Sequence, residues 1–131
     1  MINFFSKFKI IFYFLNIILI FLYLFPGSLI GIIIYNNKNI QPQLTPDFFI
    51  SSNHFYVFAL ISLTGYLSFF KKKHIRILAI YLILLSITLE TFHLIIPARS
   101  FEWSDLLGNL LGVFIVIIIN ILIKKYGYFK K

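Results

Sequence analysis

Glu90 and His93 are the residues whose types and spacing most clearly suggest chemistry, because both interrupt an otherwise apolar stretch of the chain. They are three residues apart, so in a helix they share a face. A carboxylate beside an imidazole can transfer a proton, hold a cation or orient a phosphate-bearing group. We interpret Glu90 as a candidate acid or base and His93 as a candidate binding or relay residue. The alternative is a glutamate that reaches water and pairs with the nearby Arg99.

Asp105 and Asn109 form a second polar pair, four residues apart and therefore on one helical face. Asp105 is a candidate catalytic residue that would adjust the electrostatics of Glu90 or Arg99. The alternative is that an acid at a helix N-terminus is only a favourable partner of the helix dipole. Asn109 lies one turn further along, where its amide needs a hydrogen-bond partner, so we expect it to brace the site.

His54 and Arg99 complete the set of candidates. His54 begins an apolar stretch and is either a catalytic acid–base group or an amphipathic residue at an interface. Arg99 follows Pro97 in a short turn. There its guanidinium either binds a phosphate or carboxylate through paired hydrogen bonds or anchors a helix end. The candidate catalytic residues are therefore Glu90, His54 and Asp105, and the candidate binding residues are Arg99, His93 and Asn109.

Other kinds of site are not indicated by the sequence. The chain contains no cysteine, which excludes disulfides, thiolate catalysis and cysteine-type zinc sites. The spacing of Glu90 and His93 occurs once and is not duplicated, so we expect no metal site and no cofactor. Gly-rich phosphate loops and the Gly-x-Ser-x-Gly nucleophile motif are absent from the sequence as well.

The composition shows what kind of scaffold must position these residues. Of 131 residues, 60% are hydrophobic and 12% are charged, whereas soluble domains have about 25% charged residues. The 17 Phe and 8 Tyr exceed what one small core can bury, so apolar side chains must face lipid. The formal charge of +8 comes without a basic stripe on a soluble scaffold, so we expect no nucleic-acid partner.

Four apolar stretches come close to the length of about 20 residues that a membrane-spanning helix requires. They cover approximately residues 10–25, 54–70, 75–96 and 105–123. Their length and continuity favour helices. The sequence therefore predicts an all-α, polytopic membrane protein with four transmembrane helices in a single domain, 1–131. An acid at the centre of such a helix costs about 2.5–3.5 kcal/mol, which makes Glu90 an expensive residue to keep.

A shorter apolar piece, 28–35, follows Pro26 and Gly27 and cannot cross a membrane alone. We interpret it as an interfacial or re-entrant half-helix on the outer side, before a polar connection at 36–45. Gly108 and Gly112 have the spacing of small residues that allows close helix packing. This spacing predicts a close seam beside the site, or a helix–helix oligomer formed through the two glycines.

The positions of lysine and arginine predict the orientation of the chain. Ten of the 12 basic residues precede the first stretch, lie between the second and third, or follow the fourth, whereas Lys38 and Arg99 lie on the other side. Because cytoplasmic loops are enriched in these residues, both termini are expected in the cytoplasm. All 4 acids then lie toward the outer side. No small-residue cleavage site follows the first stretch, so we expect a retained anchor.

The third and fourth stretches carry a spaced set of polar residues that resembles the signature of the VanZ-like membrane proteins. That signature consists of a Glu, a Gln or His, a Pro, an Arg-Ser pair, and then spaced Asp, Asn and Gly. The corresponding residues here are Glu90, His93, Pro97, Arg99, Ser100, Asp105, Asn109 and Gly112. His54 and Phe55 are similar to the family's His-Phe element, although Ile50 and Ser51 stand where members often have Asp-Lys.

The resemblance implies a small multi-helix protein of the bacterial cytoplasmic (inner) membrane. It also implies a connection with the cell envelope and with resistance to the glycopeptide antibiotic teicoplanin. A settled biochemical activity does not come with the family.

The sequence leads to two functional hypotheses of different classes. In the first, an outward-facing site binds or acts on a membrane lipid or a lipid-linked envelope precursor. Glu90 would be the acid or base, His54 and His93 would relay protons or bind, and Arg99 would hold an anion. In the second, the chain is a non-enzymatic accessory or structural membrane subunit whose polar cluster holds helices together. Transport is less favoured, because it would need polar residues through the full depth of the membrane.

Overall fold

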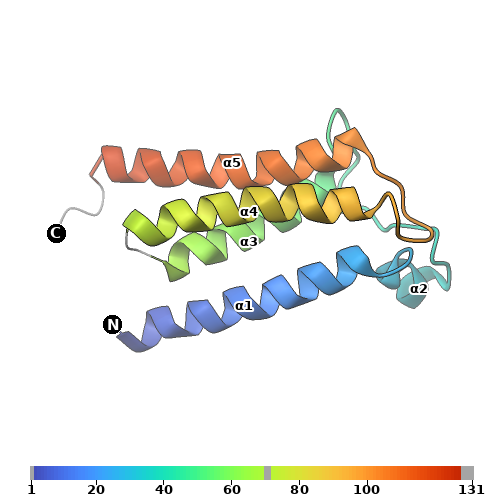
Figure 1. Cartoon of the computed structure of the whole chain (residues 1–131), viewed down its shortest axis with the longest axis horizontal. Coiled ribbons are helices and arrows are strands. Elements are labelled where there is room, and N and C mark those ends of the chain that lie inside the picture. Colours follow the sequence, from blue (N-terminus) through green and yellow to red (C-terminus); the bar gives the residue numbers. More distant parts are fainter. Residues whose placement is uncertain (1, 70–71, 128–131) are drawn as a thin grey trace.

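Five helices are found in the computed structural model, which describes residues 2–69 and 72–127 (Figure 1). No strand occurs in these two ranges, so the predicted all-α class is confirmed. The helices are α1 (Ile2–Leu24), α2 (Leu29–Tyr35), α3 (Ser52–Ser68), α4 (Lys72–Phe92) and α5 (Trp103–Lys125).

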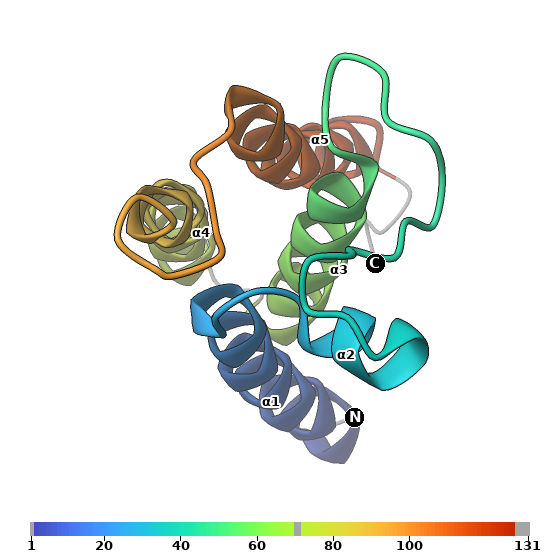
Figure 2. The same ribbon diagram turned by 90° about the vertical axis from the view of Figure 1, so that its right-hand side faces the viewer.

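Four of the helices, α1, α3, α4 and α5, lie side by side along the long axis of the molecule, and α2 lies at one end (Figures 1 and 2). We call this the loop end, because the connections α2–α3 and α4–α5 lie there too. Helix α1 begins and α5 ends at the opposite end. Phe58, Leu82 and Val113 are fully buried between the helices. The two ends of the bundle therefore differ, and the long connections lie at only one of them.

Helix α3 packs most extensively against α5, and the two run in the same direction from the loop end. The approach is close because two glycines of α5 face α3. A Cβ atom on Gly108 would lie 2.6 Å from the carbonyl oxygen of Ser51, and one on Gly112 would lie 2.5 Å from that of Phe55. The close seam is therefore found within one chain, whereas a helix–helix oligomer through the same glycines stays a prediction.

The chain bends by 79° between α1 and α2. Pro26 and Gly27 occupy the bend, and Gly27 has a φ of +85°, in the left-handed region that favours glycine. Ser28 then caps α2, since its Oγ accepts the N–H of Gly31 at 2.9 Å. The N–H of Ser28 donates to the Lys38 carbonyl at 2.7 Å. The predicted stop after the first helix and the short helix that follows are confirmed.

Two predicted helix boundaries near the candidate site are wrong. The third helix was expected to reach residue 96, but α4 ends at Phe92, so His93 lies in the turn that follows. The reason is Pro97, which lacks an N–H and whose ring clashes with the carbonyl four residues earlier, that of His93. The fourth helix begins at Trp103, so Asp105 lies in its first turn and does not open the helix.

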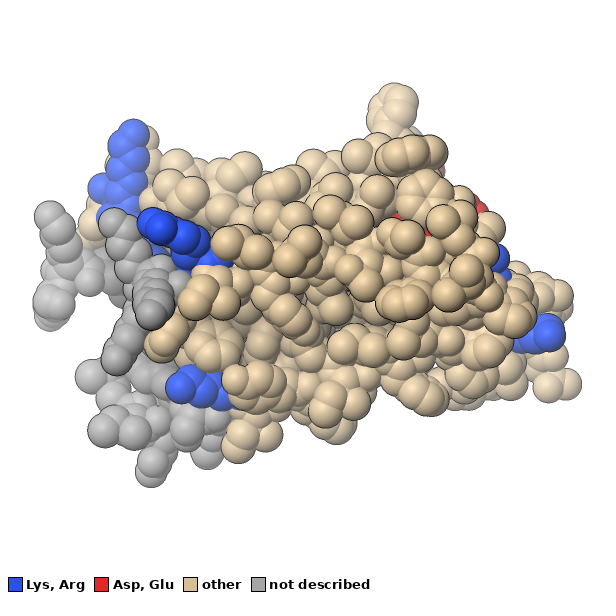
Figure 3. Space-filling model, in the orientation of Figure 1, with Lys and Arg blue, Asp and Glu red and all other residues tan. Residues whose placement is uncertain are grey.

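Within the described ranges, two helices are long and apolar enough to cross a membrane, His74–Phe92 and Trp103–Lys125. A third crossing results if the bent pair Phe8–Leu24 and Leu29–Tyr35 forms one span. Helix α3 has 17 residues, so four spans stay a prediction. Lys and Arg flank the end where α1 begins, and most of the visible surface beyond them carries no charge (Figure 3). The helices thus indicate a membrane protein, while the cytoplasmic position of the termini stays a prediction.

Some predicted features fall outside the described residues. These are the end of the second helix at Phe70, Lys71 of the basic cluster after it, and Lys130 and Lys131 at the C-terminus. Helix α1 is longer than predicted, because it begins at Ile2 and not near residue 10.

Gly112→Ala tests the seam between α3 and α5. The added methyl group would overlap the Phe55 carbonyl, so we expect the free energy of unfolding in detergent to fall by about 1–3 kcal/mol. Leu111→Ala is the matched control, because Leu111 is 44% exposed on the same helix. Denaturant unfolding followed by circular dichroism measures both variants. Equal unfolding midpoints for Gly112→Ala and the wild type would contradict the close seam.

Candidate functional site

Polar side chains from four helices meet at the loop end of the bundle. Tyr23 comes from the last turn of α1, His54 from the first turn of α3 and Glu90 from the last turn of α4. The turn after α4 and the first turns of α5 supply the others. We call these residues the polar site: Tyr23, His54, Glu90, His93, Asp105 and Asn109. The structure thus brings together five of the six candidates, and the sixth, Arg99, lies beside them.

Glu90 is completely buried, with 0% of its surface exposed. Its Oε1 accepts the backbone N–H of Glu102 at 3.2 Å and lies 3.3 Å from Nδ1 of His93. Its Oε2 has no hydrogen-bond partner in the described part of the chain and lies 3.9 Å from Nδ1 of His54. The alternative interpretation of Glu90, as a side chain that reaches water and pairs with Arg99, is therefore wrong.

His93 connects Glu90 to the end of α1. Nε2 of His93 lies 3.1 Å from the backbone carbonyl oxygen of Tyr23, which only accepts hydrogen bonds, so Nε2 carries a hydrogen. The other ring nitrogen, Nδ1, faces the Glu90 carboxyl group. That contact is favourable when the imidazole is positively charged or the carboxyl is protonated. The pair therefore places an imidazole and a carboxyl group in contact, which is the arrangement that proton exchange requires.

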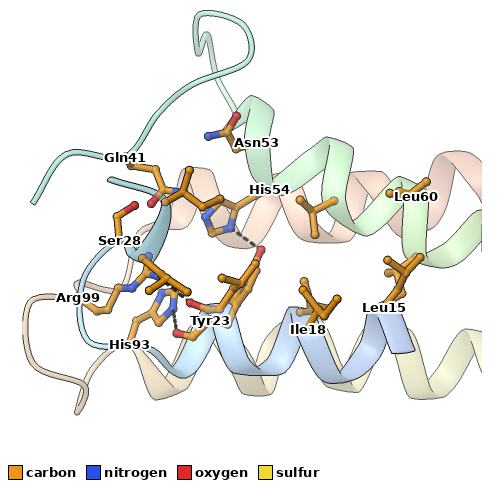
Figure 4. A pocket seen from close by; sticks show the side chains of 16 residues that line it. Leu15, Ile18, Tyr23, Ser28, Gln41, Asn53, His54, Leu60, His93 and Arg99 are labelled. Carbon is orange, nitrogen blue, oxygen red and sulfur yellow. Dashed lines mark hydrogen bonds between the residues drawn. The ribbon is translucent and has the colours of Figure 1, made fainter. Parts of the chain in front are cut away.

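Tyr23, His54 and Asn109 form a hydrogen-bonded triangle that joins α1, α3 and α5. The Tyr23 hydroxyl donates to Oδ1 of Asn109 at 2.8 Å. Nδ1 of His54 lies 3.0 Å from the Tyr23 hydroxyl and 3.1 Å from Oδ1 of Asn109. Figure 4 shows Tyr23 between the two histidines, with its hydroxyl toward His54 and its backbone toward His93. The hydrogen bond predicted for Asn109 is confirmed.

Asp105 contacts the other side of the His54 ring. Its Oδ2 lies 3.3 Å from Nε2 of His54, and 20% of its side chain is exposed. Asp105 also lies in the first turn of α5, where a carboxylate is stabilised by the helix dipole. The position of Asp105 is therefore compatible with both interpretations from the sequence. It can act electrostatically on the site and also be a partner of the helix dipole.

Arg99 holds the end of α1. Its Nη2 donates to the Leu22 carbonyl at 2.9 Å and its Nε donates to the Phe25 carbonyl at 3.3 Å. Burial lowers the pKa of Arg99 from its usual value, although the guanidinium stays charged at neutral pH. Its Nη1 has no hydrogen-bond partner in the described residues and is available to an anion.

An apolar groove begins at the polar site and runs between α1 and α3 (Figure 4). Its volume is about 220 Å³. Aliphatic side chains line most of it, among them Leu15, Ile18, Val57 and Leu60. The groove is therefore suited to a hydrocarbon chain.

A polar chamber of about 250 Å³ adjoins the groove at the loop end. Lys38 and Arg99 supply its positive charges, whereas its carboxylates come from Asp47, Glu102 and Asp105. The groove and the chamber have six lining residues in common, Ser28, Gln41, Asn53, His54, His93 and Arg99. An apolar space and a polar space thus meet at the polar site.

Tyr23 is the site residue that sequence reasoning missed. It is one of 8 Tyr and 17 Phe in a chain with many apolar stretches, and nothing local separates it from the others. The available signal was its position at the last turn of a helix that stops at Pro26 and Gly27, on the same side as the candidate residues.

Known proteins offer no independent guide to this site. No protein-family model, no curated protein and no solved structure matches the chain. Function must therefore be inferred from the chain's own residues and their geometry.

Tyr23→Phe tests the triangle. Loss of the hydroxyl removes the buried hydrogen bonds that His54 and Asn109 make to Tyr23, so we expect the free energy of unfolding in detergent to fall by about 1–3 kcal/mol. Tyr13→Phe is the matched control, because Tyr13 is 56% exposed. Thermal unfolding of the two purified variants provides the comparison. If Tyr23→Phe and Tyr13→Phe unfold together, the hydroxyl contributes nothing to the site.

Proposed function

We propose that the chain is an integral membrane protein of the bacterial cell envelope that binds, and acts on, a lipid or lipid-linked component. One observation carries this proposal, the meeting of the apolar groove and the polar chamber at His54, His93 and Arg99. An amphiphile needs both spaces, because its hydrocarbon chain and its polar head group have opposite solvent preferences.

The lining of the chamber suggests the chemistry of the head group. Arg99 and Lys38 favour an anionic group such as a phosphate, and Arg99 retains Nη1 for it. Asp47 and Glu102 lie in the same chamber and can accept hydrogen bonds from hydroxyl or amine groups. A head group with a phosphate and further polar groups therefore fits better than a simple fatty acid.

The contact between the Glu90 carboxyl group and the His93 imidazole supports a chemical role in addition to binding. In this proposal Glu90 is the acid or base, His54 and His93 relay the proton, and Asp105 adjusts the charge of the site. The VanZ-like resemblance agrees with an envelope function in the bacterial inner membrane. A link to teicoplanin resistance forms part of the same proposal.

A second candidate function is a non-enzymatic accessory or structural subunit. The observation in its favour is the triangle of Tyr23, His54 and Asn109, which connects three helices as interhelical hydrogen bonds do in membranes. This alternative has no need of the apolar groove, so the groove discriminates between the two functions.

Val57→Trp tests the groove. Val57 lines it and is 38% exposed, so an indole there would occupy space meant for the hydrocarbon chain. The purified protein in detergent is titrated with a polyprenyl phosphate, and binding is followed by native mass spectrometry. We expect Val57→Trp to bind the polyprenyl phosphate at least about tenfold more weakly than the wild type does, equivalent to 1.4 kcal/mol.

Ile118→Trp is the matched control for the groove, since Ile118 is 51% exposed and lies outside it. It should bind like the wild type. Failure of the wild type to bind the polyprenyl phosphate, or equal binding by Val57→Trp, would favour the structural subunit.

Glu90→Gln tests the chemical role in cells. Lipid extracts are compared between wild-type cells, deletion cells and deletion cells that express the variant. We expect deletion cells that express the variant to keep the lipid composition of the deletion strain, because an amide cannot exchange a proton as a carboxyl group does. The membrane abundance of the variant should equal that of the wild-type protein. Thr91→Val, at an exposed position next to Glu90 that lines neither the groove nor the chamber, is the control and should restore the wild-type composition. Full restoration by Glu90→Gln would refute catalysis by this residue.

A further inference from the structure

Three potential metal ligands converge in the polar site from three different helices. His54 of α3, Glu90 of α4 and Asp105 of α5 each offer one ligand atom, and these atoms lie within 4.8 Å of one another. The sequence predicted no metal site, because the Glu-x-x-His spacing of Glu90 and His93 occurs once and is not duplicated. Only the packing of the helices brings them together.

The hydrogen bonds around His54 determine which ring nitrogen faces the carboxylates. Because the Tyr23 hydroxyl donates to Asn109, both oxygens present lone pairs to Nδ1 of His54. The network therefore assigns the hydrogen of the neutral ring to Nδ1. Nε2 is then left with a lone pair, and it faces Oδ2 of Asp105 at 3.3 Å. Two lone pairs at this distance repel each other unless a cation lies between them.

Glu90 supplies a second and independent observation. Its Oε2 is buried and has no hydrogen-bond donor in the described residues, since Nδ1 of His54 lies 3.9 Å away. A carboxylate oxygen without water or a donor is costly to bury. A bound cation would remove that cost.

We propose that the polar site binds one divalent metal ion of the zinc class through Nε2 of His54, Oε2 of Glu90 and Oδ2 of Asp105. Two carboxylates and a neutral imidazole balance the charge of such an ion. An imidazole ligand favours Zn²⁺ over Mg²⁺, which prefers oxygen ligands and water. Three protein ligands leave a fourth position for water or a substrate oxygen, as in catalytic zinc sites.

The surrounding geometry agrees with this assignment. In a tetrahedral site with bonds of about 2.0–2.1 Å, ligand atoms are about 3.3–3.4 Å apart, and His54 and Asp105 are already 3.3 Å apart. The ligand oxygen of Glu90 lies within 4.8 Å of the other two ligand atoms and must move closer to reach the same spacing. Tyr23 and Asn109 accept from Nδ1 of His54, which is the usual way to orient a ligating histidine. The polar chamber, lined by His54 and Asp105, gives the ion access from outside.

The test uses the full-length protein in detergent and the metal alone, without lipid, so its outcome is independent of the proposed function. The protein is stripped with a chelator, dialysed against micromolar Zn²⁺ or Mg²⁺, and its metal content is measured by mass spectrometry. We expect one Zn²⁺ per chain and no retained Mg²⁺. A wild-type protein that retains no Zn²⁺ would overturn the proposal and leave a proton as the balancing cation.

Variants locate the ion. Glu90→Gln and Asp105→Asn should each weaken Zn²⁺ binding at least about tenfold. Asp105 is partly exposed, so its variant keeps the test decisive if Glu90→Gln does not fold. His74→Gln removes an exposed imidazole outside the ligand set, and it should bind like the wild type. Unchanged Zn²⁺ affinity in Asp105→Asn would overturn the assignment.

Discussion

A carboxylate that water cannot reach is the constraint on which the loop end of this molecule depends. Glu90 lies in an apolar bundle at 0% exposure, so the protein itself must provide every partner of its oxygens. The start of α5 provides the Glu102 N–H, and the turn after α4 provides the His93 ring. One buried side chain thus requires the end of α4 and the start of α5 to be held in register.

The seam between α3 and α5 places the remaining chemistry. Gly108 of α5 lies against the carbonyl of Ser51 at the start of α3. Ser51 is one turn before His54, and Gly108 is one turn after Asp105. The Ser51 N–H also donates to the Ser104 carbonyl at 3.1 Å, which ties the beginnings of the two helices. The imidazole and the carboxylate therefore lie at the same level because the backbones that carry them touch.

Local composition was sufficient to predict the helices and the level of the polar residues. Apolar length determines the helices, and Pro97 could have located the end of α4 just before His93, because the ring of a proline blocks the carbonyl four residues earlier. The partners of each side chain could not be predicted, because they depend on how α1 packs. Tyr23 enters the site, and Arg99 binds the Leu22 carbonyl, only because the end of α1 lies against α3 and the α4–α5 turn.

The bonds from Arg99 to α1 couple the occupancy of the chamber to the position of a helix. Arg99 uses Nε and Nη2 on the carbonyls of Phe25 and Leu22, at the end of α1. These bonds leave both hydrogens of Nη1 and the second hydrogen of Nη2 free, so an anion can contact the Nη1–Nη2 edge while both carbonyls stay in place. Thermodynamic linkage makes the relation reciprocal: the docked end of α1 orders the guanidinium for an anion, and a bound anion would in turn stabilise the docked end of α1. One guanidinium thus holds α1 and still presents free donors to the chamber.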